Sequence, residues 1–158
     1  MKLIPLILIL TLIPTCQPAF AIETPDWDRL VPAIIEVESN GNPNAYSGYA
    51  YGLMQVSSIV LKEYAQVEEG LFFEEGNVVN VGKLYDPSFN IMIGSWYLKR
   101  LYHYYKCPSI EHILAAYNGG ITRLRKNNWD IDKMPRETRN YVKCVMKLYN
   151  QGDNNETQ

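Results

Sequence analysis

The sequence predicts one mainly α-helical domain, and three observations lead to this fold class. Several segments repeat apolar residues with the period of a helix, and they are bounded by capping residues or by Gly, Asn and Pro. Without an expected leader of 21 residues, the 158-residue chain keeps 137 residues, the usual size of one domain. The sequence also has no internal repeat, no heptad run and no Gly-rich phosphate loop. We therefore expect one helical domain over residues 22–149, followed by a disordered polar tail over 150–158.

The first 21 residues have the three-part layout of a secretory signal peptide. Lys2 precedes an apolar run from Leu3 to Ile13, and Ala19-Phe20-Ala21 supplies the small residues of a cleavage site. The apolar run is shorter than the roughly 20 residues that a membrane span requires. We expect export with cleavage after Ala21. The alternative is lipidation at Cys16, which the residues before that cysteine fit poorly.

Charge and cysteine content exclude other classes of protein. Once Lys2 is lost with the leader, 14 basic residues face 17 acidic ones, a net charge of −3 that argues against a general nucleic-acid binder. Cys107 and Cys144 remain, and in an exported protein such a pair most simply forms a disulfide. Two unpaired buried thiols are the alternative. Neither His103 nor His112 stands at a metal-ligand spacing from these cysteines, so we expect no metal.

The first helix, expected from about Asp28, places one carboxylate on its apolar side. At 100° per residue, Glu38 shares one stripe with Leu30, Val31, Ile34 and Ile35. Glu36 points to the opposite side, and Asn40-Gly41 ends the helix. Desolvation and the negative end of the helix dipole both favour the protonated form of Glu38. Glu38 is therefore a candidate general acid, although a carboxylate at a helix end could also point into solvent.

The remaining elements follow from caps and breakers. Asp26 or Asp28 would cap the first helix, and Pro32 is tolerated only in its first turn. The second helix is expected over 56–66, and its buried side is expected to consist of Ile59, Val60, Tyr64 and Val67. The segment 67–85 is expected to be an acidic loop that could shape one wall of a cleft. Further helices are expected from Asp86-Pro87 to about Tyr105, from Ser109 to about Asn118, over 122–126, and from Arg136 to about Tyr149.

Four short motifs occur along the chain in a fixed order. They are Glu38-Ser39 with Asn42-Pro43, Ala45 and Ser47; Gly52-Leu53-Met54-Gln55; Ala116-Tyr117-Asn118-Gly119-Gly120; and Glu137-Thr138-Arg139-Asn140-Tyr141-Val142. Together they resemble the signature of the lytic transglycosylases, lysozyme-like enzymes that cleave the glycan strands of peptidoglycan. Gly119 stands where the family's third motif usually has Ala, a change that removes no functional group.

The resemblance implies a lysozyme-like fold with Glu38 at a helix end in the cleft. In this family a single glutamate protonates the glycosidic oxygen and then deprotonates the C6 hydroxyl of the same sugar. The product has a 1,6-anhydro-muramic acid end, and neither water nor a cofactor is consumed. The resemblance also implies that Tyr141 orients Glu38. Substrate contacts are implied for Ser47, Gln55, Tyr117 and Asn118.

Two rival functions remain open on the sequence alone. A lysozyme-type hydrolase would use a water molecule and leave a reducing end, and Asp86 or Glu63 could approach as its second carboxylate. A non-catalytic glycan-binding or assembly protein is the other rival, against which the presence of Glu38 and Tyr141 argues. The layout also resembles specialised periplasmic members that open the wall for a secretion, conjugation or pilus machine. We expect such a protein to be a monomer.

Overall fold

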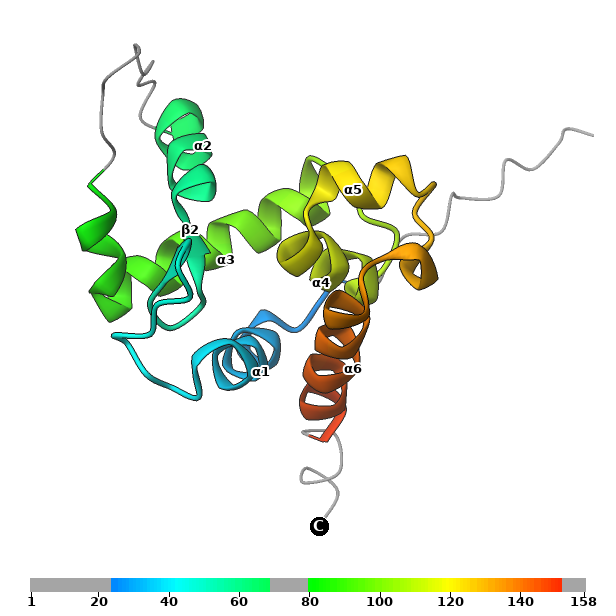
Figure 1. Ribbon diagram of the computed structural model, residues 1–158, viewed down its shortest axis with the longest axis horizontal. Coiled ribbons are helices and arrows are strands. Elements are labelled where there is room, and N and C mark those ends of the chain that lie inside the picture. Colours follow the sequence, from blue (N-terminus) through cyan, green and yellow to red (C-terminus); the bar gives the residue numbers. More distant parts are fainter. Residues whose placement is uncertain (1–23, 69–79, 152–158) are drawn as a thin grey trace, which may run out of the picture.

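A computed structural model describes residues 24–68 and 80–151 of the chain (Figure 1). The predicted signal peptide, residues 1–21, lies outside the described residues. So do positions 69–79, which form most of the acidic loop expected over 67–85, and positions 152–158 of the predicted tail. The first two positions of that tail, Asn150 and Gln151, continue the last helix.

The described part of the chain is built mainly from helices, as predicted. The long helix α3 runs through the middle, with α2 and the two strands on one side and α4, α5 and α6 on the other (Figure 1). The strands pair antiparallel in a short hairpin. The elements are α1 (Trp27–Ser39), β1 (Ala50–Tyr51), β2 (Val56–Ser57), α2 (Ser58–Glu68), η1 (Val81–Tyr85), α3 (Pro87–His103), α4 (Ile110–Gly119), α5 (Ile121–Lys126), η2 (Ile131–Lys133) and α6 (Arg136–Gln151).

Helix caps define most of these boundaries. The side chains of Asp26, Asp86 and Ser109 each accept a hydrogen bond from a backbone N–H in the first turn of α1, α3 and α4. The expectation that Pro32 lies in the first turn of α1 is wrong, because the helix begins at Trp27 and Pro32 falls in its second turn. Proline there removes one backbone hydrogen bond. Burial of the apolar side of α1 offsets this cost.

The second helix differs from its prediction in start and in buried face. The first two residues of the predicted segment 56–66 form strand β2, so α2 begins only at Ser58. Its fully buried side chains are Leu61 and Ala65. Of the four residues predicted to be buried, Val60 and Tyr64 are partly buried against the core, whereas Ile59 is 75% exposed and Val67 is 45% exposed. The apolar period alone therefore predicted only part of the buried face. Contact with α3 and with the hairpin determines which side of α2 is covered.

A buried asparagine joins the hairpin to α3. The Oδ1 atom of Asn90 accepts a hydrogen bond from the backbone N–H of Met54 at 2.8 Å. Its Nδ2 atom donates to the backbone carbonyls of Tyr51 and Leu84, both also at 2.8 Å. Gly52 lies so close beneath this network that an added Cβ would be 2.3 Å from the Leu84 oxygen. The loop that follows α1 is thereby fixed to the central helix.

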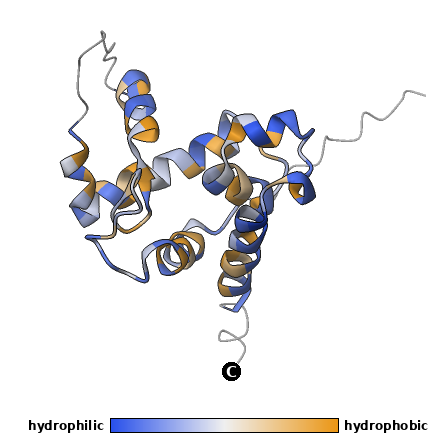
Figure 2. Cartoon of the chain, viewed as in Figure 1, coloured by the Kyte–Doolittle hydropathy of each residue, from blue (hydrophilic) through white to orange (hydrophobic). Residues whose placement is uncertain are grey.

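The core lies where α1, α3, α4 and α6 meet, and α6 packs against both α1 and α4. Apolar and polar residues alternate around α6, as expected for a helix with one buried side (Figure 2). Within residues 24–68 and 80–151, no helix has both the length and the apolar character needed to cross a membrane. Fully buried side chains of the core include Leu30, Ile34, Leu98, Leu101, Ile113, Leu114, Leu124 and Val145.

The predicted disulfide between Cys107 and Cys144 is wrong, because both thiols are free in the structure. Cys107 follows α3 and is fully buried in the core, where desolvation raises the pKa of its thiol to about 12. Cys144 lies on the exposed side of α6. Cys107 therefore acts as a small apolar core residue. The sequence could not show that the two side chains face different environments.

We predict that Asn90→Ala lowers the free energy of unfolding by about 3 kcal/mol, because it leaves buried backbone groups of the hairpin without partners. Urea unfolding followed by circular dichroism measures the change. Asn44→Ala, which alters an exposed asparagine of the same loop, is the matched control. Equal losses in the two variants would show that the Asn90 network does not support the hairpin.

Candidate active site

A cleft of about 440 Å³ lies between the hairpin side of the molecule and the side formed by α4 and α6. Five of the six residues predicted from the sequence line it, and the sixth, Tyr141, is buried next to Glu38. Ser47 and Asn118 are exposed at the rim. The residues that line the cleft are Glu38, Ser47, Tyr49, Ala50, Gln55, Val56, Ser57, Ile59, Val60, Tyr97, Ala116, Tyr117, Asn118, Gly119, Gly120 and Glu137.

Glu38 occupies the last turn of α1, one residue before the helix ends. Asn40 closes the helix in the left-handed conformation, with φ of 50°, as the Asn40-Gly41 stop predicted. Burial of the carboxyl is the main cause that raises the pKa of Glu38 to about 7, and the charge of Glu137 adds to it. The nearby hydroxyl of Tyr141 acts in the opposite direction and lowers this pKa. Glu38 is therefore about half protonated at neutral pH and suited to acid–base chemistry.

Tyr141 approaches Glu38 from α6. Its hydroxyl is buried and makes no hydrogen bond of normal geometry with a described group, yet its interaction with Glu38 still favours the carboxylate. Burial and the charge of Glu38 raise the pKa of Tyr141 well above its ordinary value, so the phenol keeps its proton. The arrangement places an available O–H donor beside a carboxyl group. Such a donor can stabilise the anion that forms when Glu38 gives up its proton.

Tyr117 connects α4 to the loop on the other side of the cleft. Its hydroxyl donates a hydrogen bond to the backbone carbonyl of Met54 at 2.9 Å. Its ring lies 5.8 Å from the ring of Tyr97, which comes from α3. Burial and then the nearby charge of Glu38 raise the pKa of Tyr117 well above its ordinary value. The hydroxyl is thus engaged with the backbone, and the ring forms part of the cleft wall.

Gln55 supports the loop as well as lining the cleft. Its backbone is in the left-handed region, with φ of 47°, which costs about 1 kcal/mol for a residue with a side chain. Its Nε2 atom donates to the backbone carbonyls of Ala45 at 3.1 Å and Gly52 at 2.9 Å. These two bonds offset the strain. They leave the side-chain oxygen of Gln55 as the atom able to meet a ligand.

Ser39 fixes the end of α1 next to Glu38. Its hydroxyl lies 2.7 Å from the backbone carbonyl of Leu53 and 3.1 Å from that of Ile35. A hydroxyl has one proton, so the shorter contact to Leu53 is the stronger bond. This bond joins the helix end to the same loop that Asn90 holds on its other side. The Glu38 carboxyl is therefore carried by backbone that is fixed at two points.

The structure adds Glu137 to the cleft residues, whereas the sequence named it only as the first residue of the fourth motif. Its side chain lines the cleft, and its charge raises the pKa of Glu38. A signal was present, because residues four apart share one face of a helix and Tyr141 was already predicted to lie at Glu38. Two other carboxylates are engaged elsewhere. Asp86 caps α3, and Glu63 binds Arg100 and Tyr105.

Among the residues that the structure describes, no three His, Cys, Asp or Glu side chains gather closely enough to hold a metal ion. Glu38 and Glu137 are the carboxylates among the residues that line the cleft. The carboxyl groups of these two residues can transfer protons, and the hydroxyl and amide groups of other lining residues can support them.

Comparison with known sequences identifies similar proteins. The family model described as the Transglycosylase SLT domain matches residues 23–142. A transglycosylase of Enterobacteria phage PRD1 is 31% identical over 123 residues, which are 77% of this chain and 37% of that protein. Membrane-bound lytic murein transglycosylase E of Buchnera aphidicola is 33% identical over 130 residues, which are 76% of this chain and 54% of that protein. The chain thus spans only part of the length of these relatives.

Comparison with solved structures gives the same result for the fold. The 70-kDa soluble lytic transglycosylase of Escherichia coli aligns with a TM-score of 0.64 and 29% identity, covering 81% of this chain and 21% of that one. A complex of the 70-kDa enzyme with bulgecin A aligns with a TM-score of 0.67 and 26% identity, covering 87% of this chain and 23% of that one. An inactive mutant of Slt from Pseudomonas aeruginosa aligns with a TM-score of 0.62 and 27% identity, covering 80% of this chain and 22% of that one. The predicted lysozyme-like, mainly α fold class is confirmed.

We predict that the stability of the protein depends on the ionisation of Glu38. Between the ordinary pKa of 4.5 and the folded value of about 7, the native state holds a proton that the unfolded chain has lost. The free energy of unfolding therefore falls as the pH rises through this window. The difference in the free energy of unfolding between Glu38→Gln and wild type should therefore grow by about 2 kcal/mol in favour of the variant from pH 5 to pH 8. Urea unfolding at the two pH values measures the difference.

Glu36→Gln is the control for this experiment, because Glu36 is an exposed carboxyl on the opposite side of the same helix. If Glu38→Gln and Glu36→Gln show the same change between the two pH values, the carboxyl of Glu38 is not desolvated as described.

Proposed function

Because the chain belongs to the Transglycosylase SLT domain family, whose model matches residues 23–142, we propose that it is a lytic transglycosylase that cleaves peptidoglycan glycan strands. The observation that carries the proposal is a single half-buried glutamate whose pKa is raised to about 7 in a cleft between two sides of the fold. The names of the relatives, which include a lytic murein transglycosylase, support the substrate class.

The first step is cleavage of the bond between the muramic acid C1 and the glycosidic oxygen. Glu38 donates its proton to that oxygen, and the departing sugar leaves with the new hydroxyl. A pKa of about 7 keeps enough acid at neutral pH for this transfer. Glu38 becomes a carboxylate in a partly desolvated site. The hydroxyl of Tyr141 is placed to stabilise that anion.

The second step restores Glu38. Its carboxylate removes the proton from the C6 hydroxyl of the same sugar, and O6 forms a bond to C1. The glycan then ends in a 1,6-anhydro ring, no water is consumed, and Glu38 is protonated again for another cycle. The nucleophile belongs to the substrate, so this route requires one carboxyl group for both proton transfers. Glu137 lines the same cleft, and its charge favours the protonated form of Glu38.

The other cleft residues would hold the glycan in position. The exposed side chains of Ser47 and Asn118 offer a hydroxyl and an amide at the rim. The side-chain oxygen of Gln55 accepts hydrogen bonds from sugar hydroxyls or acetamido groups. The ring of Tyr117 forms an apolar wall for a sugar face, since its hydroxyl is already bound to the backbone.

Export through the leader at residues 1–21 would place this activity in the periplasm, where peptidoglycan lies. Lipidation at Cys16 is the alternative to cleavage after Ala21. Service to an envelope-spanning secretion, conjugation or pilus machine, and a monomeric state, stay predictions from the sequence.

We predict that the purified domain releases muropeptides with 1,6-anhydro ends from peptidoglycan, detected by mass spectrometry as products one water lighter than hydrolysis products. Glu38→Gln should lower the rate by at least about 100-fold, because it removes the group that transfers the proton. Glu36→Gln is the matched control and should release the same products as wild type.

The product distinguishes the competing functions. Reducing ends would identify a hydrolase, and their loss in Glu137→Gln would make Glu137 its second carboxylate. Failure of the wild-type domain to cleave any glycan would indicate a binding or assembly role. Full activity of Glu38→Gln would contradict the assignment of the catalytic residue.

A further inference from the structure

Within residues 24–68 and 80–151, the two most exposed large apolar side chains both lie at the cleft. Ile59 is 75% exposed and Tyr49 is 70% exposed, and each of them lines the cleft that holds Glu38. Tyr49 belongs to the loop before β1, and Ile59 lies in the first turn of α2. Both residues therefore stand on the hairpin side of the cleft. Apolar side chains that are left uncovered together in a concave site mark a place where a ligand binds.

The turn that carries Tyr49 is held in place by its neighbours. The hydroxyl of Tyr46 donates a hydrogen bond to the backbone carbonyl of Gly48 at 2.6 Å, and the ring of Tyr46 lies 5.0 Å from the ring of Tyr51. Gly48 adopts φ of 96°, a left-handed conformation that costs glycine little. In the described part of the chain, no hydrogen bond or ring contact involves the side chain of Tyr49. The backbone under Tyr49 is therefore fixed while its aromatic face stays uncovered, which lowers the entropy cost of binding a ligand.

The opposite rim of the cleft is polar. It presents the amide of Asn118, the carboxyl of Glu137 and the backbone of Gly120. A ligand that fits both rims needs an apolar face and polar groups along its edge. A pyranose ring in a chair conformation has this structure, because its C–H groups lie on its faces and its hydroxyl and acetamido groups lie around its edge. The negatively polarised face of an aromatic ring attracts such C–H groups.

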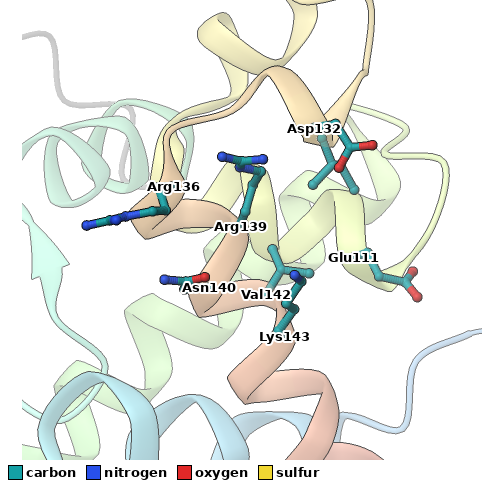
Figure 3. Close-up of a pocket in the computed structure, with 8 residues that line it drawn as sticks. Glu111, Asp132, Arg136, Arg139, Asn140, Val142 and Lys143 are labelled. Atoms are coloured by element: carbon teal, nitrogen blue, oxygen red, sulfur yellow. The ribbon is translucent and has the colours of Figure 1, made fainter.

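A second pocket, beside α6, differs from the cleft in its lining. It has a volume of about 370 Å³, and most of the side chains that Figure 3 labels there carry a charge, Glu111, Arg136 and Lys143 among them. Neither Tyr49 nor Ile59 lines this pocket. The exposed apolar surface that suits the face of a sugar is therefore on the hairpin side of the cleft.

We propose that Tyr49 and Ile59 form a platform that binds a second sugar of the glycan, next to the sugar that reacts at Glu38. Glu38 is half-buried in the cleft, whereas Tyr49 and Ile59 are exposed at its rim, so they contact different sugars of one strand. The Tyr49 ring stacks on the C–H face of the second sugar, and Ile59 contacts the methyl of its acetamido group. The platform strengthens the binding of a strand without taking part in proton transfer. The proposal rests on the proposed function for the identity of the substrate.

The first test measures binding without turnover. Chitotetraose, a β-1,4-linked tetramer of N-acetylglucosamine, has the C–H faces and acetamido groups that the platform would contact. It is titrated by calorimetry into Glu38→Gln protein, in which the proton donor is absent. Adding Tyr49→Ala should weaken binding about three- to tenfold, whereas adding Tyr49→Phe should preserve it, because stacking requires the ring and not the hydroxyl. Ile59→Asn should also weaken binding, since it replaces an apolar contact with a polar group.

Two exposed residues outside the cleft supply matched controls. Tyr104→Ala changes a tyrosine that is 64% exposed, and Val67→Asn changes an apolar residue of α2 that is 45% exposed. Neither residue lines the cleft, so both variants should bind chitotetraose with the affinity of the Glu38→Gln protein. Absence of chitotetraose binding, or equal affinities in Tyr49→Ala and Tyr104→Ala, would overturn the proposal.

The second test measures kcat and KM on peptidoglycan with an otherwise wild-type protein. A contact with a sugar that does not react is equally strong in the ground state and in the transition state. Tyr49→Ala should therefore raise KM about three- to tenfold with little change in kcat, and Tyr49→Phe should restore KM. A fall in kcat with an unchanged KM would contradict the platform. If wild type cleaves no glycan, the proposed function fails, and the chitotetraose titration still decides whether the platform exists.

Discussion

Removal of the Glu38 carboxyl from water is the constraint on which the rest of the site depends. Helix α1 carries the group to its last turn, but a helix end by itself would leave it exposed. One wall is the loop held by Ser39 and Asn90, and the other comes from Tyr117 and Tyr141 on α4 and α6. If either wall moved away, water would return and the pKa of Glu38 would drop toward 4.5.

The same arrangement explains why stability is concentrated away from the cleft. A carboxyl with a raised pKa and a left-handed glutamine both weaken the folded state near neutral pH. The exposed Tyr49 and Ile59 at the cleft contribute little burial. These costs are offset by the network of Asn90 and by the core beneath α1 and α6, where apolar side chains are fully buried. The cleft can keep its geometry because the framework behind it is fixed.

The parts of the fold that depend on local chemistry could be predicted from the sequence. Capping by Asp86 and Ser109, the stop at Asn40-Gly41 and the stripe that carries Glu38 all follow from rules that operate within one or two turns. The predictions that proved wrong concern features that depend on contacts between distant segments. The buried face of α2 is determined by α3, and the separate environments of Cys107 and Cys144 are determined by how α6 packs.

In the candidate site, too, some features follow from local sequence and others depend on contacts between distant segments. Ordered motifs indicated Glu38, Tyr117 and Tyr141, and the fold brings these residues together. The role of Gln55 as a support of its own loop was not visible in the sequence, because it depends on a left-handed backbone and on two carbonyls of the loop. Glu137 was not predicted to line the cleft, because the sequence identified it only as the first residue of a motif. The direction of its side chain becomes clear only when α6 is placed beside the cleft.

The central claim is that the fold keeps Glu38 partly protonated at neutral pH and that Tyr141 acts on this carboxyl. It is tested most directly by NMR titration of ¹³C-labelled glutamate side chains, with the Glu38 signal assigned by its absence in Glu38→Gln. The midpoint for wild type should lie at about 7, and it should rise in Tyr141→Phe because a group that favours the anion is lost. A wild-type midpoint near 4.5, or a midpoint that does not rise in Tyr141→Phe, would contradict the account.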